Sequence, residues 1–214
     1  MLKFDLMLNL DGLILLLTGL TAIYLLWYFY KRYQKEKALY DIYYMMGFVV
    51  LLVSGLLLIF FGWGILASPY VLTVATLIPL GISMGLMNQF MPDYKKLYSW
   101  FALVGLLAIA YTSISGHSLK SVAVPVFHGV AGLIIFGLPL YKCFVTKDAV
   151  KGFGLVGVGG ALIGIGGIAL AFLVAGKPLL GIFTADFIFA ILAPLLFLMT
   201  LAFTWGFRKD IGSD

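Results

Sequence analysis

The chain has 214 residues, of which 63% are hydrophobic and only 11% are charged, and its formal net charge is +5. A soluble domain has about 25% charged residues because its surface must be wetted. With a mean hydropathy of +1.12, most of this surface must instead face lipid. The basic residues lie in short segments between apolar runs, which excludes a nucleic-acid partner in favour of membrane topology. The length suits a single transmembrane domain, residues 1–214.

Seven apolar runs are long enough to cross a bilayer, because a helical crossing needs about 20 apolar residues. Helices are the expected form, since every backbone polar group must be satisfied away from water. The predicted fold class is therefore all-α, an integral membrane bundle of seven transmembrane helices in the cell membrane. The predicted spans are 10–30, 42–66, 70–91, 97–116, 121–143, 152–175 and 180–207.

Lysine and arginine are distributed unevenly between the two sides of these spans. The segments after odd-numbered spans hold 11 of them, whereas the N-terminus and the segments after even-numbered spans hold 3. The positive-inside rule then predicts an N-terminus outside the cell and a C-terminus in the cytoplasm. The longest cytoplasmic connection, 31–41, is expected to be a helical extension or a contact with lipid headgroups.

Spans two and six share a pattern of glycines at a displacement of 105 positions. A parallel duplication would give repeat halves 10–91 and 121–207 with the span 97–116 as a linker. Such a 3+1+3 plan is found in transporters, while the chance recurrence of glycine in membrane helices is the alternative. The matching positions are Gly47-Phe48, Gly55, Leu57 and Gly62 against Gly152-Phe153, Gly160, Leu162 and Gly167.

Glycines at helical spacing predict close helix packing. Gly157, Gly160, Gly164 and Gly167 fall on one face of span six, and Gly81 and Gly85 form a second small-xxx-small pair. Without side chains another helix backbone can approach closely. The alternative is a helix that slides during a transport cycle. Prolines within the spans predict kinks, read either as structural bends or as gating hinges. They are Pro79, Pro125, Pro139 and Pro194.

Ionisable residues within the spans are the candidates for a functional site. Asp186 and His128 each lie roughly 10 Å below the outer surface, where an uncompensated charge is costly. Asp11 and His117 lie nearer the outer edge. Together the four predict an outward-opening binding pocket for a proton, a cation or a cationic substrate. The alternative is a hydrated vestibule.

Neither a cofactor, a metal site nor a catalytic residue is predicted. Haem would need two histidines at similar depth, but His117 lies in or beside a loop. The single cysteine, Cys143, cannot form an intramolecular disulfide. The partners expected are membrane lipid, a small solute or cation, and a second copy or another membrane subunit.

Motifs of known seven-helix families are largely missing from the chain. The span corresponding to the retinal-binding helix of microbial rhodopsins has no lysine, and the proline-glutamine signature of sugar-efflux transporters is missing. The Gly-Phe pairs with their later glycines resemble an uncharacterised family of small prokaryotic seven-helix membrane proteins, a resemblance that implies no activity. A transporter of a small solute or ion is the preferred function. An accessory or structural subunit and a lipid-acting membrane enzyme are the alternatives.

Overall fold

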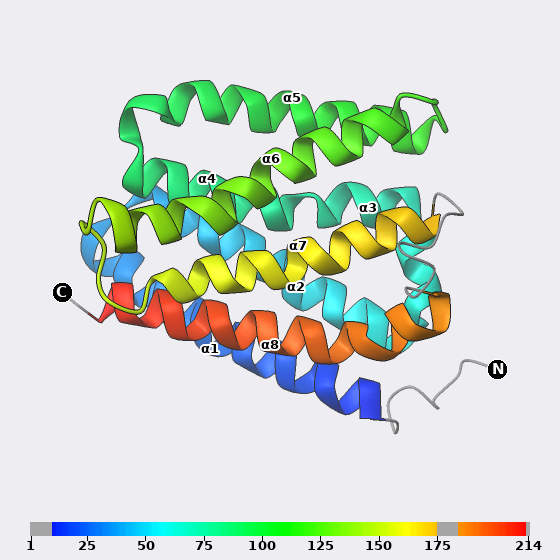
Figure 1. The fold of residues 1–214 in the computed structure, drawn as a ribbon, viewed down its shortest axis with the longest axis horizontal. Helices are drawn as coiled ribbons and strands as arrows, with labels where there is room; N and C mark the ends of the chain where they lie inside the picture. The colour runs from blue at the N-terminus through cyan, green and yellow to red at the C-terminus, as the bar shows by residue number, and fades with distance from the viewer. Residues whose placement is uncertain (1–9, 175–183, 213–214) are drawn as a thin grey trace.

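A computed structural model of the chain describes residues 10–174 and 184–212, and residues 169–174, 185 and 186 by their backbone alone. All the regular structure in these ranges is helical (Figure 1). The α-helices are α1 (Leu10–Glu36), α2 (Leu39–Phe61), α3 (Pro69–Ala75), α4 (Leu77–Phe90), α5 (Lys95–Ile114), α6 (Lys120–Leu140), α7 (Gly154–Val174) and α8 (Ala185–Ile211). Short 3-10 turns occupy Trp63–Ala67 and Pro92–Tyr94, and a π-helical turn, Tyr141–Val145, continues α6.

Six helical segments of the described chain are long and apolar enough to cross a membrane. The prediction of a helical membrane protein is thus confirmed at this level, and the chain is a polytopic bundle. The sixth predicted span, 152–175, coincides with α7 (Gly154–Val174), whose side chains are described over Gly154–Ile168. The span count of seven, the orientation and the duplication stay predictions. The six segments are Leu10–Glu36, Leu39–Phe61, Pro69–Phe90, Pro92–Ile114, Lys120–Val145 and Phe187–Ile211.

Six helices form a closed ring in the order α1, α2, α4, α6, α7 and α8, with α8 packing back on α1. The remaining long helix, α5, lies outside this ring and packs on α3, α4 and α6 (Figure 1). Helices α1, α4, α6 and α8 finish at the same end of the bundle at which α2, α5 and α7 begin. We call this the charged end, and the other the opposite end.

The buried core is a single cluster toward the charged end and is divided elsewhere. The large cluster draws residues from all six helices of the ring, including Phe29, Phe48, Leu86, Ile135 and Phe207. Two smaller clusters lie apart from it. One, around Leu15 and Leu58, joins α1, α2 and α8, and the other, around Leu80 and Ala131, joins α4, α5 and α6.

Glycine contacts follow the same division. A Cβ atom on Gly160 would lie 2.9 Å from backbone atoms of Ile135 and Phe136 in α6, so these helices touch backbone to backbone. A Cβ on Gly157 would meet the Phe136 carbonyl at 2.6 Å. Further along α7, Gly164 and Gly167 have open space at this position. Helices α6 and α7 therefore pack tightly near the charged end and lose this contact toward the opposite end.

The second predicted glycine pair packs against α2. A Cβ on Gly81 would lie 2.9 Å from the Gly47 backbone nitrogen, and one on Gly85 would overlap the Tyr44 ring. The third predicted span is broken at Thr76 into α3 and α4. Pro79 has no N–H to donate to the Ala75 carbonyl, which removes a helical hydrogen bond at this break.

Candidate functional site

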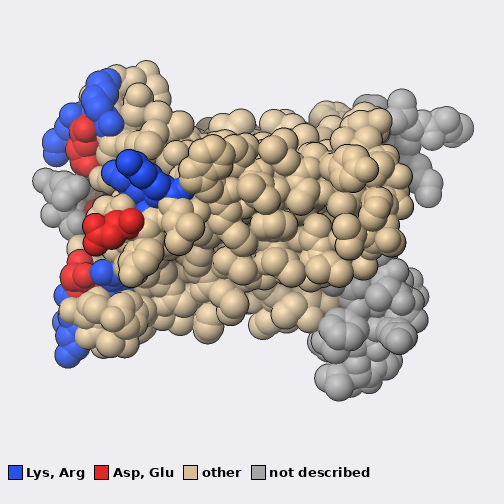
Figure 2. All heavy atoms as spheres, turned by 90° about the horizontal axis from the view of Figure 1, so that it is seen from above, with Lys and Arg blue, Asp and Glu red and all other residues tan. Residues whose placement is uncertain are grey.

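Charged side chains gather at one end of the bundle, beyond a body that is almost entirely uncharged (Figure 2). Most of them are exposed, as expected for residues that meet water and lipid headgroups. Arg32, Asp41 and Asp210 differ because their side chains are only 3%, 0% and 11% exposed. A buried charge is costly unless it is paired and hydrogen-bonded. These three residues are therefore the first candidates for a functional site.

Arg32 binds two carboxylates from two other helices. Its Nε donates to Asp41 Oδ1 at 2.9 Å and its Nη2 donates to the same oxygen at 2.7 Å. Its Nη1 donates to Asp210 Oδ2 at 2.8 Å. The planar guanidinium can hold two carboxylates at once because its donors point in fixed directions. Arg32 thus ties α1 to both α2 and α8.

A second pair of residues extends this network to α4. Gln89 Nε2 donates to Asp210 Oδ2 at 2.8 Å, and the Tyr44 hydroxyl donates to Gln89 Oε1 at 2.8 Å. The Tyr44 ring is fully buried and stacks on Phe29 at 5.0 Å between centroids. We call Arg32, Asp41, Asp210, Gln89 and Tyr44 the Arg32 clamp. It joins four of the six ring helices at the charged end.

Helical periodicity places the charged members of the clamp on buried faces. Arg32 follows Leu25 and Phe29 at spacings of four and three, and both of these are fully buried. Asp210 follows Phe203 and Phe207 in the same way. Residues three and four apart lie on one face of a helix, so each charged side chain extends the apolar stripe of its own helix toward the core.

The two carboxylates of the clamp share one guanidinium. Arg32 is bonded to both Asp41 and Asp210. The Arg32 guanidinium also lies 4.9 Å from the centroid of the Tyr40 ring, which adds a cation–π contact on one side.

Two of the predicted pocket residues lie at opposite edges of the bundle. Asp11 is in the first turn of α1, which packs on α2 and α8. His117 is exposed in the turn between α5 and α6, where its Nδ1 accepts a hydrogen bond from the Leu119 N–H at 3.2 Å. Its ring lies 6.2 Å from that of Tyr111. Figure 1 shows α1 and the α5–α6 turn on different sides of the bundle.

His128 lies about two turns into α6 and is half-buried, one turn before the fully buried Ala131. Its Nδ1 atom is buried, interacts with the Val124 carbonyl of the preceding turn and makes no hydrogen bond of good geometry. The Asp186 side chain lies outside the described residues, although its backbone belongs to the first turn of α8. Helix α7 separates α6 from α8 in the ring. The pairing of His128 with Asp186 stays a prediction.

Metal ligands do not gather in the part of the chain whose side chains are described, where no group of three His, Cys, Asp or Glu is close enough to hold an ion. Cys143 lies in the π-helical turn and its Sγ donates to the Val150 carbonyl at 3.4 Å.

Comparison with protein-family models, with curated proteins and with solved structures finds no match to this chain. The resemblance of its Gly-Phe pairs to an uncharacterised seven-helix family therefore stays a prediction. Function has to be argued from the clamp and from the packing around it.

Proposed function

We propose that this chain transports a small solute or cation by alternating access, with the Arg32 clamp as its gate at the cytoplasmic end. The observation that carries the proposal is the closure of the charged end. There the six ring helices share one core, above which the clamp ties four of them together. Of the two smaller described clusters, the one around Leu15 and Leu58 lies nearer the opposite end, and the one around Leu80 and Ala131 joins α5 to α4 and α6.

The order of the ring supports a duplicated transporter. In the predicted 3+1+3 plan, α1, α2 and α4 correspond to α6, α7 and α8. The middle helix of each half packs on both of its neighbours. The contact of α1 with α8 between the halves then corresponds to that of α6 with α4, and both are present. Two halves that rock about a shared axis are a common basis of alternating access.

The energetics of a buried ion pair favour a switching role over a stabilising one. Removing two charges from water costs several kcal/mol per ion, and apolar residues of similar volume often give equal or greater stability. Because the cost of removing the charges from water nearly cancels their attraction, such a clamp can form in one state and open in another at little cost in free energy.

In this proposal, the bundle is open to the outside at the opposite end while the charged end is closed. A Cβ on Gly164 or Gly167 of α7 would have no neighbour within 4 Å among the described residues. His128, with its buried Nδ1, is on the part of α6 that has diverged from α7. With the N-terminus outside, as the basic residues predict, the state described is closed to the cytoplasm. His128 and Asp186 are the residues we propose to meet the solute first.

The single cysteine provides a test that needs no known substrate. Cys143 is half-buried at the charged end, so its rate of maleimide labelling reports opening there. Asp210→Asn weakens the clamp between α1 and α8 while leaving Arg32 paired with Asp41. We expect Asp210→Asn to speed Cys143 labelling. A Gly164→Cys reporter, placed in a Cys143→Ser background, should label more slowly with the same change, because one end closes as the other opens.

Lys35→Gln is the matched control, because it removes a charge from the exposed part of α1. It should change neither labelling rate. If Asp210→Asn speeds Cys143 labelling and leaves the Gly164→Cys reporter unchanged, the clamp only stabilises the bundle and the transport proposal is wrong.

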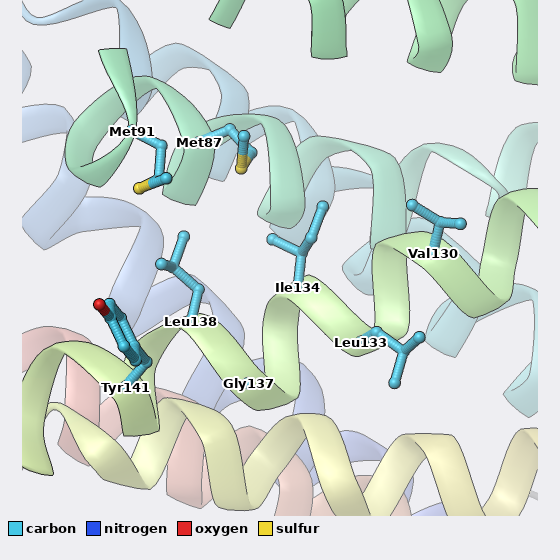
Figure 3. Close-up of a pocket in the computed structure, with 8 residues that line it drawn as sticks. All are labelled: Met87, Met91, Val130, Leu133, Ile134, Gly137, Leu138 and Tyr141. Carbon is cyan, nitrogen blue, oxygen red and sulfur yellow. The ribbon is translucent and has the colours of Figure 1, made fainter. Parts of the chain in front are cut away.

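A non-catalytic subunit of a membrane complex is the second candidate. A groove of about 380 Å³ between α4 and α6 supports it, since every side chain around it is apolar except Tyr141 (Figure 3). Gly129, Gly132 and Gly137 of α6 also have open space where a Cβ would lie, which would admit another helix. Leu133→Trp would then reduce the size of the native assembly without altering Cys143 labelling. An unchanged assembly would count against this candidate.

A further inference from the structure

A second groove at the charged end lies outside the ring, where α2 and α5 begin and α4 ends. Its volume is about 310 Å³. It differs from the groove between α4 and α6 because it combines basic, polar and apolar side chains. The lining residues are Leu39, Tyr43, Asn88, Lys95, Lys96, Ser99, Trp100 and Leu103.

The side chains of this groove are layered along the membrane normal. Lys95 and Lys96 are exposed in the first turn of α5, at the level of the lipid headgroups. Trp100 lies about one turn deeper and is 67% exposed, in the zone that favours amphipathic rings. Leu103 is eight residues beyond Lys95, roughly 12 Å deeper at 1.5 Å per residue. The groove therefore runs from a cationic rim to an apolar floor.

The two lysines at this rim have no ion-pair partner among the described residues, whereas several neighbouring cations are engaged. Lys142 pairs with Asp148 at 2.7 Å, and Arg32 is held in the clamp. Lys31 lies over the Trp27 ring at 3.6 Å. Near the groove, Asp93 is the acidic residue of the same segment and balances one of the two lysines. A net positive charge remains at the rim.

We propose that this groove binds an anionic phospholipid. Lys95 and Lys96 contact the headgroup phosphate, and Asn88 offers the Nδ2 hydrogen that it does not donate to the Met84 carbonyl. The acyl chain lies along Trp100 and Leu103. Basic pockets between transmembrane helices suit anionic headgroups because each lysine near the surface contributes favourable electrostatic energy. Because the groove faces lipid at the membrane edge, a lipid reaches it more directly than a free anion does.

Tryptophan quenching in nanodiscs tests the proposal on the full chain. Replacing Trp27, Trp63 and Trp205 by Phe leaves Trp100 as the reporter. We expect brominated phosphatidylglycerol at low mole fraction to quench Trp100 more strongly than brominated phosphatidylcholine. Lys95→Gln with Lys96→Gln should reduce this preference roughly thirtyfold, given about 1 kcal/mol for each of the two lysines near the surface. Lys35→Gln with Lys151→Gln, which removes two charges outside the groove, should leave it unchanged.

Three results would overturn the proposal. The first is equal quenching by the two lipids, and the second is a preference that survives the loss of Lys95 and Lys96. The third is a preference abolished by added inorganic phosphate, because the groove would then bind a free anion. If the fold does not tolerate the three Phe substitutions, native mass spectrometry of the unaltered chain makes the same comparison. Retention of phosphatidylglycerol over phosphatidylcholine, lost in the Lys95→Gln/Lys96→Gln variant, is the expected result.

Discussion

The two ends of the bundle are held together by different interactions, although the same helices run through both. At the charged end, backbones approach through glycine, one aromatic core fills the ring, and the Arg32 clamp closes it. Among the described residues nearer the opposite end, the core is the small cluster around Leu15 and Leu58, and Gly164 and Gly167 of α7 have no described neighbour within 4 Å of a Cβ. The described contacts between the ring helices are therefore densest at the charged end.

Removal of the clamp arginine should give the largest difference between the ends. Arg32→Leu leaves Asp41 and Asp210 buried together without their cation, and breaking such a pair costs about 3–5 kcal/mol. The free energy of unfolding in mixed micelles measures this loss. Lys120→Gln at the opposite end is the control and should stay within about 0.5 kcal/mol of the wild type. If Arg32→Leu and Lys120→Gln reduce the free energy of unfolding by similar amounts, the charged end is not held together more strongly than the opposite end.

Two glycines one turn apart on α7 give a matched comparison within one helix. Gly160→Ala places a methyl group 2.9 Å from the α6 backbone, and overpacking of this kind costs about 1–3 kcal/mol. Gly164→Ala meets open space and should be neutral or slightly stabilising, because alanine favours the helix. Thermal unfolding in detergent distinguishes them. Equal melting temperatures would mean that α6 and α7 are no closer at the charged end.

The hydroxyl of Tyr44 should have a smaller effect. Tyr44→Phe keeps the buried ring but leaves Gln89 Oε1 without its donor, at a cost of about 1–2 kcal/mol. Tyr111→Phe is the counterpart at the opposite end, where the ring is 66% exposed. It should leave stability unchanged within error. If Tyr44→Phe leaves the free energy of unfolding unchanged, the hydrogen bond to Gln89 does not contribute to stability and α4 is not part of the clamp.

The smallest expected effect depends on pH and concerns the connection after α6. Hydrogen bonds from Lys142 and Thr146 lower the pKa of Asp148 below its usual range. A lowered pKa adds stability that is fully present above the unfolded value, near 3.9, and is lost as the pH falls through the folded value. Asp148→Asn should therefore reduce stability slightly at neutral pH and converge with the wild type in acid. Lys142→Gln should raise the pKa of Asp148, as measured by NMR.

Apolar runs were sufficient to predict the helices but not the clamp. The helix over 10–36 outlasts the predicted span by six residues, and α8 continues four residues past 207. Arg32 and Asp210 lie in these extensions; the stretch 31–41 was predicted to be a helical extension or a headgroup contact, but neither residue was predicted to be buried or paired. Arg32 counted as a signal of orientation, and Gln89 was not among the candidates. One signal in the sequence could have identified both charged residues. Each lies in register with the buried apolar stripe of its own helix, Leu25–Phe29–Arg32 in α1 and Phe203–Phe207–Asp210 in α8.

What sequence could not supply was the pairing of distant segments. Nothing local to Asp210 indicates that its partner is 178 positions away. The glycines of span six were expected to share one packed face, yet Gly157 and Gly160 meet α6 while Gly164 and Gly167 meet no described residue within 4 Å. Which glycines are packed depends on where the neighbouring helices lie, which glycine spacing alone does not specify. For Asp186 and His128, depth could be predicted from position, whereas orientation could not.

The order in which the clamp is assembled during synthesis follows from its sequence separations. Arg32 and Asp41 are nine positions apart on two helices joined by a two-residue turn, so this pair can form as soon as the first hairpin has entered the membrane. Asp210 emerges with the last helix. Because domains form from the N-terminus as the chain is made, a chain that stops short of Asp210 leaves the Arg32 Nη1 without this carboxylate. The network is thus complete only once α8 has been made, and we expect chains truncated before α8 to be degraded faster in pulse-chase experiments than chains carrying Lys209→Gln.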